Sequence, residues 1–222
     1  MTQFYLSQLR LNPTSRMVQK ELGNPYEMHR TLQAAFNQSR QAANVLHRLE
    51  IDSYSDSISL LVQSTQLPDW ENVTQKGQGR YLKSVPMSKE VNLSFSTGQL
   101  FRFRLVANPS VKRDGKRHAF YKEEDQLKWL LTKGVGSEAL KRPSNGFKVI
   151  DAHIHKRGNQ HGWIKSKANE DQPERNQRLK FQAVQYDGLL QVTDPNTFSA
   201  ALINGIGPSK AFGCGLLSLA PA

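Results

Sequence analysis

Hydrophobic and polar residues alternate in two segments of the chain, and each segment ends at an Asn-Pro pair. Residues 3–11 end at Asn12-Pro13, and residues 100–107 end at Asn108-Pro109. Alternation with a period of two indicates a half-buried strand, and proline next to it ends the strand because it lacks a backbone N–H. The two segments therefore predict a chain of two similar units that each begin with a strand.

A helical pattern follows each of these strands after a polar stretch. Apolar residues repeat at intervals of three and four in residues 25–46 and again in residues 123–133, which is typical of a helix with one face on a core. In the first unit we further expect strands at residues 58–62 and 81–85. A short helix is expected to begin within residues 68–73.

The second unit continues with more strands. Residues 147–155 and 179–186 have strand-like patterns, and Asp187-Gly188 predicts a tight hairpin into another strand at residues 189–193. The polar and basic residues 157–178 match neither pattern. We expect them to form a mobile loop or hairpin.

A last helix is predicted to begin at Asp194-Pro195, because aspartate is a favoured N-cap and proline suits the first helical position. It ends near Gly205. The order strand, helix, two strands, helix, strand is clear in the second unit and expected in the first. The predicted fold class is therefore α+β, with two tandem ferredoxin-like (RRM-like) domains at residues 1–94 and 95–222.

Positive charge is concentrated in the second unit. The formal net charge is +11 with a pI near 9.8, and residues 100–222 hold twenty Lys and Arg against eleven Asp and Glu. Such an excess indicates a nucleic-acid or anionic-membrane partner. The chain has no run of eighteen apolar residues and no signal-peptide pattern, and its one cysteine, Cys214, fits a reducing compartment. We therefore expect a cytoplasmic nucleic-acid-binding protein with no membrane partner.

The start of the first helix brings three reactive side chains together. Asn24 is expected to cap the helix, and Glu27 stands where a capping-box carboxylate would return to the cap. Tyr26 and His29 lie one turn apart on the face turned away from the apolar stripe, with Arg30 beside them. An imidazole and a phenol should therefore project together next to an arginine.

These three side chains suit the cleavage of RNA through its own 2′-hydroxyl. That reaction needs a proton acceptor, a proton donor for the leaving 5′-oxygen and cations near the phosphate, and it needs no metal. His29 can act as acid or base, Tyr26 can orient the hydroxyl or donate a proton, and Arg30 can hold phosphate oxygens. Each has an ordinary alternative, since a histidine near a helix start often lies at the surface and a tyrosine often packs.

The C-terminal region contains a glycine-rich loop that leads into an apolar strand. Glycine permits positive φ angles and close backbone approach, so the loop can turn N–H groups toward phosphate oxygens. The alternative is a tight loop that packs under a sheet. The loop lacks the ending of a P-loop, and its spacing alone favours the packing alternative. Its place after the last predicted helix, in a chain with the Tyr26–His29 helix start, leads us to expect that it positions an RNA backbone. Its residues of interest are Gly205, Gly207, Ser209, Lys210, Gly213 and Gly215.

Two further basic clusters in the second unit suit an RNA stem. A-form RNA is held mainly through phosphates and 2′-hydroxyls, although each single cation has the alternative of being a solvated surface charge. His153 and His155 share one face of a strand, but without a third ligand we expect no metal site and no cofactor. The clusters are Lys112, Arg113, Lys116 and Arg117 in one connection and His155, Lys156, Arg157, Lys165 and Lys167 in another.

Together these features resemble the CasE family of CRISPR-associated endoribonucleases. They occur in the same order over nearly the whole chain, so their combination is more specific than any one motif. They are the first strand ending in Asn12-Pro13, the segment Asn24-Pro25-Tyr26-Glu27-Met28-His29-Arg30, Trp70 after Pro68-Asp69, the segment Phe101-Arg102-Phe103-Arg104-Leu105 with Ala107-Asn108-Pro109, and the glycine-rich loop.

The resemblance implies a fold, an activity and partners. It implies paired ferredoxin-like domains and metal-independent cleavage of CRISPR repeat RNA at the base of its stem-loop, which leaves a 5′-hydroxyl and a 2′,3′-cyclic phosphate or 3′-phosphate. His29 matches the family's catalytic histidine and Tyr26 its accompanying tyrosine. The mature crRNA is expected to stay bound by its 3′ stem-loop, with the other Cascade subunits as partners.

The chain departs from some relatives at one point. Where they carry a lysine beyond the histidine on the same helix, this chain has Gln33-Ala34-Ala35. The positive charge at the transition state must then come from elsewhere, and Arg30 and Lys210 are the candidates. Two other functions stay open, a catalytically silent repeat-RNA-binding subunit of Cascade and an unrelated basic RNA-binding protein. Tyr26 and His29 in one helix start favour the endoribonuclease.

Overall fold

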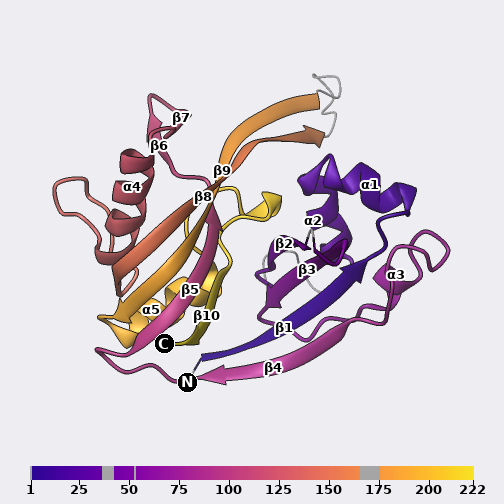
Figure 1. Cartoon of the computed structure of the whole chain (residues 1–222), viewed down its shortest axis with the longest axis horizontal. Coiled ribbons are helices and arrows are strands. Elements are labelled where there is room, and N and C mark those ends of the chain that lie inside the picture. The colour runs from indigo at the N-terminus through magenta and orange to yellow at the C-terminus, as the bar shows by residue number, and fades with distance from the viewer. Residues whose placement is uncertain (1, 37–42, 53, 166–175) are drawn as a thin grey trace, which may run out of the picture.

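The computed structural model describes residues 2–36, 43–52, 54–165 and 176–222. These residues form two four-stranded antiparallel sheets and one two-stranded sheet. The two large sheets stand side by side, and both chain ends lie at the same end of the molecule (Figure 1). Each of the two predicted units therefore contains one of the large sheets, and the two units lie next to each other.

The first sheet has the strand order β2-β3-β1-β4, which is that of a ferredoxin-like domain. Helices α1 and α2 pack on it through Val18, Met28 and Leu32, which share a buried cluster with strand residues such as Leu9 and Leu60. The elements are β1 (Thr2–Leu11), α1 (Arg16–Leu22), α2 (Pro25–Gln33), β2 (Leu46–Asp52), β3 (Ser57–Ser64), α3 (Glu71–Thr74) and β4 (Met87–Leu93).

The second sheet has the equivalent order β10-β5-β9-β8. Helices α4 and α5 share one buried cluster with this sheet. The elements are β5 (Leu100–Ala107), β6 (Ser110–Arg113), β7 (Lys116–Ala119), α4 (Glu123–Val135), β8 (Phe147–Lys165), β9 (Asn176–Val192), α5 (Pro195–Asn204), the 3₁₀ turn η1 (Lys210–Phe212) and β10 (Leu217–Pro221). The predicted fold class of two tandem ferredoxin-like domains is confirmed. The division between residues 94 and 95 stays a prediction.

The first domain differs from the sequence prediction in its middle. The helix predicted at residues 25–46 ends at Gln33, and Leu46 already belongs to strand β2. The final strand expected at residues 81–85 is instead β4, while Tyr81 and Leu82 are buried outside any strand. Short apolar runs fit either a helix or a strand, and only their partners in the sheet decide between the two. Helix α1 was not predicted.

The hairpin predicted at Asp187-Gly188 is wrong, because β9 runs without interruption through both residues. A Cβ on Gly188 would stand 2.0 Å from the Asp151 carbonyl oxygen, next to a register shift of β8 after Val149. Glycine is therefore required by close backbone approach and not by a turn. Of the two alternatives expected for residues 157–178, the described residues support the hairpin, because β8 and β9 pair antiparallel as far as Lys165 and Asn176. Residues 166–175 lie outside the described residues.

The end of the chain agrees with the prediction. The Asp194 carboxylate caps α5 by accepting hydrogen bonds from the backbone N–H groups of Asn196 at 2.9 Å and Thr197 at 3.1 Å. Helix α5 then ends at Asn204, directly before Gly205. The cap was readable from the sequence because it joins residues only two and three positions apart.

Arg48 of β2 connects the two domains from a buried position. Its guanidinium donates to the backbone carbonyl oxygens of Arg104 at 3.2 Å and Leu216 at 3.3 Å, and to the Glu50 carboxylate at 2.6 Å. The Glu50 carboxylate also lies 3.6 Å from the guanidinium of Arg157. The Arg104 guanidinium of β5 lies 3.7 Å from the same carboxylate, so charged groups of β2, β5 and β8 meet between the sheets.

We expect replacement of Arg48 by methionine to destabilise the fold by about 2 kcal/mol, because two backbone carbonyl oxygens lose a charged hydrogen-bond donor. Methionine keeps most of the stem volume but leaves two buried carbonyl groups without their donor. Urea unfolding followed by circular dichroism measures the change. The control is Arg102→Met on the exposed face of β5, and equal midpoints for the two variants would contradict the prediction.

Candidate active site

Helix α2 begins at the junction of the two domains. Pro25 occupies its first turn as predicted, but the Asn24 side chain makes no cap hydrogen bond. Its amide oxygen instead accepts from the backbone N–H of Trp163 on β8 at 3.1 Å, and its amide nitrogen donates to the Trp163 carbonyl oxygen at 3.5 Å. The predicted cap is thus wrong, and Asn24 ties the start of α2 to the second domain.

His29 is fixed by groups from two different elements. Gln33, one turn later on α2, has its side-chain nitrogen 3.0 Å from His29 Nε2. The His29 ring also stacks on the ring of His47 from β2, with centroids 5.5 Å apart and planes inclined by 22°. The imidazole is therefore held both at its edge and at its face.

Tyr26 lies one turn before His29 and faces the glycine-rich loop. Its ring centroid is 5.8 Å from that of Phe212, the last residue of η1. Phe212 in turn packs on Phe181 of β9, with centroids 5.2 Å apart. In Figure 1 the turn η1 reaches from the second domain toward α2. The tertiary structure thus brings the phenol and the loop of the C-terminal region together.

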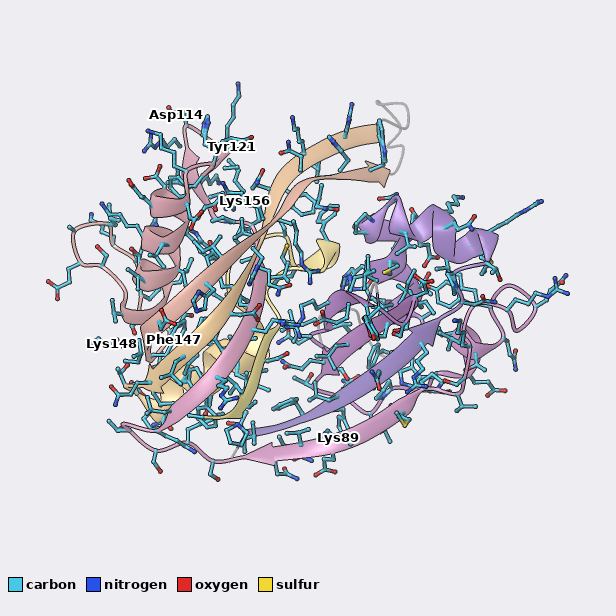
Figure 2. All side chains as sticks on the ribbon, viewed as in Figure 1. Lys89, Asp114, Tyr121, Phe147, Lys148 and Lys156 are labelled. Carbon is cyan, nitrogen blue, oxygen red and sulfur yellow. The ribbon has the colours of Figure 1, made fainter. Side chains whose placement is uncertain are left out.

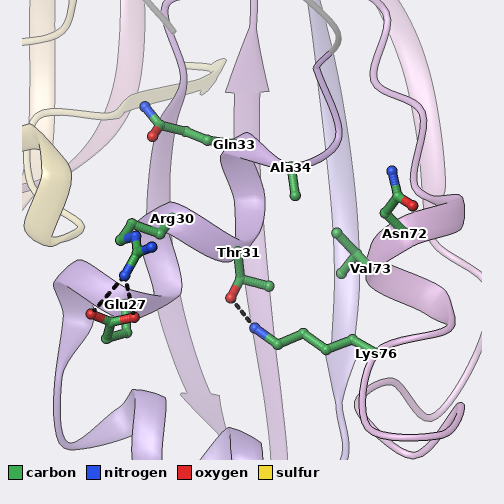
Figure 3. Close-up of a pocket in the computed structure, with 8 residues that line it drawn as sticks. All are labelled: Glu27, Arg30, Thr31, Gln33, Ala34, Asn72, Val73 and Lys76. Atoms are coloured by element: carbon green, nitrogen blue, oxygen red, sulfur yellow. Dashed lines mark hydrogen bonds and ion pairs between the residues drawn. The ribbon is translucent and has the colours of Figure 1, made fainter.

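Arg30 is engaged by its own helix. Its guanidinium lies 3.1 and 3.2 Å from the two carboxylate oxygens of Glu27, which replaces the predicted capping box. Both residues line a hollow of about 420 Å³ between α2 and the α3 region, together with Lys76 (Figure 3). His29 does not line this hollow. The pair leaves Arg30 half-exposed, but with its charge already balanced.

A hydrogen-bond network around the buried Glu21 connects α2 to α1 and to the segment after α3. The Glu21 carboxylate of α1 accepts hydrogen bonds from Thr31 of α2 at 2.7 Å and from the Tyr81 hydroxyl at 2.5 Å. Lys76 donates to Glu21 and to Thr31, the second contact being drawn in Figure 3. Burial, followed by the charge of Glu21, raises the pKa of Tyr81. These hydrogen bonds fix the position of α2 relative to α1 and to the segment after α3.

The glycines of the C-terminal loop are explained by packing. Gly205 and Gly207 have φ angles of 74° and 83°. A Cβ on Gly205 would stand 2.9 Å from the Leu46 methyl groups, and one on Gly207 would stand 2.9 Å from the Trp129 ring. The loop therefore fits tightly between the two domains, as in the packing alternative. Its contact with RNA stays a prediction, as do the roles of Gly213 and Gly215.

Ser209 and Lys210 lie where this loop meets α2. The Ser209 hydroxyl accepts a hydrogen bond from the Asn108 side chain at 2.8 Å. Lys210 begins η1, and burial lowers the pKa of its ammonium group. Within the described residues Lys210 has no ion-pair partner. It is thus a cation of η1 whose charge no ion pair among these residues balances, and, after burial, its charge contributes to a lowered pKa of Lys133 on α4.

The first basic cluster forms a hairpin. Strands β6 and β7 pair Lys112 with Arg117 and Arg113 with Lys116, and Asp114-Gly115 makes the turn with φ angles of 48° and 74°. The four cations are exposed. Asp114 at the hairpin tip and Lys156 on β8 lie toward the same end of the molecule (Figure 2). The hairpin therefore presents its four cations to solvent.

The second basic cluster is divided by the structure. Lys156 is exposed, whereas Arg157 donates to the Leu49 carbonyl oxygen at 2.9 Å and to the Gln185 amide oxygen. The His155 ring lies 3.6 Å from the Asp187 carboxylate. Arg157 therefore helps to hold the domains together, and its part in RNA binding is open. The side chain of Lys165 and the whole of Lys167 lie outside the described residues.

Three residues near Tyr26 or His29 were not identified as site residues from the sequence. Gln33 was noted only as the residue present where some relatives carry lysine, and its helical spacing of four from His29 was the available signal. His47 and Phe212 carried no local signal, because their contacts with α2 come from distant parts of the chain. Burial raises the pKa of Cys214 to about 12, so the thiol beside this site is not a nucleophile.

Neither a metal-binding cluster of side chains nor a membrane-spanning helix occurs in the part of the chain that the structure describes. No group of three or more His, Cys, Asp or Glu side chains in residues 2–36, 43–52, 54–165 and 176–222 is arranged to hold a metal ion. Among the helices in those ranges, none is long and apolar enough to cross a membrane.

Comparisons with known proteins identify the family. Residues 4–221 match the model of a family described as CRISPR associated protein. The chain is 34% identical to the CRISPR-associated endoribonuclease Cse3 of Thermus thermophilus over 98% of this chain and all of that protein. It is 30% identical to the Cascade subunit CasE of Escherichia coli K12, over 88% of this chain and 92% of that protein.

A solved structure of Thermus thermophilus Cse3, bound to an RNA representing a pre-cleavage complex, has the same fold. Its TM-score is 0.78 at 32% identity, with 99% of this chain and 100% of that chain covered. Fold, order of motifs and sequence identity agree over nearly the full length. The chain belongs to the CasE family of CRISPR-associated proteins.

Proposed function

We propose that this chain cleaves CRISPR repeat RNA at the base of its stem-loop without a metal ion, with Tyr26 and His29 at the reacting atoms. As a CasE family member it is an endoribonuclease that binds repeat RNA and assembles with Cascade. The observation that carries the site assignment is the His29 imidazole at the domain junction, held by Gln33 and His47 with Tyr26 one turn away.

The proposed step is an internal transesterification. The 2′-oxygen attacks the phosphorus as its proton leaves, and the bond to the 5′-oxygen breaks as that oxygen receives a proton. The products are a 2′,3′-cyclic phosphate and a 5′-hydroxyl, so no oxidant or water molecule is needed in this step. His29 exchanges a proton with one of these oxygens, and Tyr26 orients or protonates the other.

For the charge that develops on the phosphate, we favour Lys210 over Arg30. Arg30 is balanced by Glu27, whereas Lys210 has no ion-pair partner among the described residues and belongs to the turn beside Tyr26. An unbalanced cation in a partly buried place stabilises a phosphorane more strongly than a neutralised one.

The exposed cations supply the grip on the RNA stem. The β6–β7 hairpin presents Lys112, Arg113, Lys116 and Arg117 to solvent, and Lys156 lies toward the same end of the molecule. Phosphate contacts of this kind position a duplex without reading its sequence. We propose that they hold the 3′ stem-loop of the crRNA after cleavage, in the cytoplasm that the composition predicts.

The proposed function is tested by the ends of the products. Incubation with a repeat stem-loop in excess EDTA is expected to give cutting at one position, with a 5′-hydroxyl on the downstream fragment and a cyclic phosphate upstream. Mass spectrometry of both fragments identifies these ends. A 5′-phosphate on the downstream fragment, or loss of cutting in EDTA that Mg²⁺ restores, would show a different reaction.

A further inference from the structure

His47 is a buried imidazole beside His29, and no step of the proposed reaction uses it. It lies on β2 opposite Val62 of β3, with 1% of its surface exposed. Its ring is stacked on that of His29 at 5.5 Å and 22°. The support under the His29 ring is therefore another planar ring from a different element.

The loop of the second domain lies against the edge of the same ring. A Cβ on Gly213 would stand 3.5 Å from His47 Nε2 and 3.7 Å from its Cδ2. Gly213 has a φ angle of 81° and follows Phe212 directly. His47 thus lies between α2 and the turn that carries Lys210, so it contacts both parts of the proposed site.

The Nδ1 atom of His47 does not explain why this ring lies beside His29. The buried Nδ1 of His47 has no hydrogen-bond partner among the described residues, and such groups are rare in folded proteins. Burial, followed by the charge of His29, lowers the pKa of His47 to about 3, so the ring is neutral near pH 7 and does not exchange protons there. What His47 offers its neighbours is the face of its ring.

We propose that His47 is a positioning residue that fixes the plane of the His29 imidazole for cleavage. The contact with Gln33 holds one nitrogen at the edge of the His29 ring. The stack with His47 supports the face of the same ring. The proposal rests on the proposed role of His29, because a tilt of the ring matters only if its nitrogen must meet a substrate oxygen.

Two substitutions separate positioning from volume. His47→Phe keeps a planar ring, and the missing Cβ of Gly213 leaves space beside it, whereas His47→Leu fills a similar volume without one. With saturating enzyme and one turnover, we expect His47→Leu to cut repeat RNA at least about tenfold more slowly, since small misplacements of reacting groups are costly. His47→Phe is expected to stay within about threefold of the wild-type rate, because the ring plane is retained.

Every outcome of this comparison decides the proposal. Wild-type rates for both variants would overturn it, because volume alone would then suffice. Equal losses in both would also overturn it, because the imidazole nitrogens would then be what the reaction requires. The affinity for an uncleavable 2′-deoxy RNA should be unchanged in both variants. His153→Leu, at an exposed position of β8, is the matched control.

A spectroscopic measurement covers the case in which a variant does not fold. In the wild-type protein with ¹³C-labelled histidine, the His29 Hε1 resonance is expected upfield of that of exposed His153, because it lies against the His47 ring. Equal shifts for the two resonances would overturn the stack itself. Failure of the proposed function can be told apart from failure of this proposal. If His29 has no role, His29→Ala cuts RNA at the wild-type rate, whatever the rates of the His47 variants.

Discussion

Replacement of His29 by alanine is expected to slow cleavage of a repeat stem-loop by about 10³-fold, within the range that general acid–base catalysis supplies. The substitution removes the one imidazole that Gln33 and His47 hold in place next to Tyr26. Affinity for the RNA should not fall, because the exposed cations that grip phosphates lie elsewhere. Single-turnover cleavage in EDTA, with a filter-binding titration of the same RNA, measures both quantities.

The control for this experiment is His153→Ala. His153 is an exposed histidine of β8, 3.4 Å from Asp151 and without a part in the proposed site. It should cut and bind as the wild type does. Unchanged cleavage by His29→Ala would remove His29 from the mechanism, and a parallel loss of RNA binding would assign it to binding instead of chemistry.

Replacement of the 2′-hydroxyl at the cleavage position by hydrogen is expected to abolish cleavage altogether. The proposed reaction has no other nucleophile, so removing this one oxygen removes the step that every side chain serves. Binding should stay close to that of the unmodified RNA, because a single hydroxyl contributes little to a stem held through many phosphates. Gel analysis of end-labelled RNA over long incubation measures residual cutting.

The matched control carries the same 2′-deoxy change one nucleotide away from the cleavage position. That RNA should be cut at close to the normal rate. Cutting of the first substrate at the original position would show that water or a side chain attacks the phosphorus, and the assignment of Tyr26 and His29 to the 2′-hydroxyl and the 5′-oxygen would then fail.

Local features of the fold were predictable because they depend on neighbours in sequence. Alternation identified β1 and β5, and the Asp194 carboxylate caps α5 within three residues of itself. Features that depend on distant backbone were not predictable. Gly188 has the sequence signature of a turn, but it lies within a strand because the Asp151 carbonyl oxygen comes too close for a side chain.

The same division applies to the candidate site. The spacing of Tyr26 and His29 on one helix face could be read directly, since one turn of helix separates them. Asn24 was expected to cap that helix, and only the position of β8 shows that it binds the backbone of Trp163. Arg30 was expected to hold the phosphate, but in the structure its guanidinium is paired with the Glu27 carboxylate.

By itself the sequence determined that this chain has two ferredoxin-like domains, a basic second half and a Tyr26–His29 pair at a helix start. The sequence also showed the glycine-rich loop, but it did not determine what the loop contacts. Only the tertiary structure decided that this loop closes against His47, and that His47 supports the ring of His29. The reason is physical, because periodicity and spacing act over a few residues, whereas the contacts that fix a side chain's orientation come from strands and loops that the fold brings together.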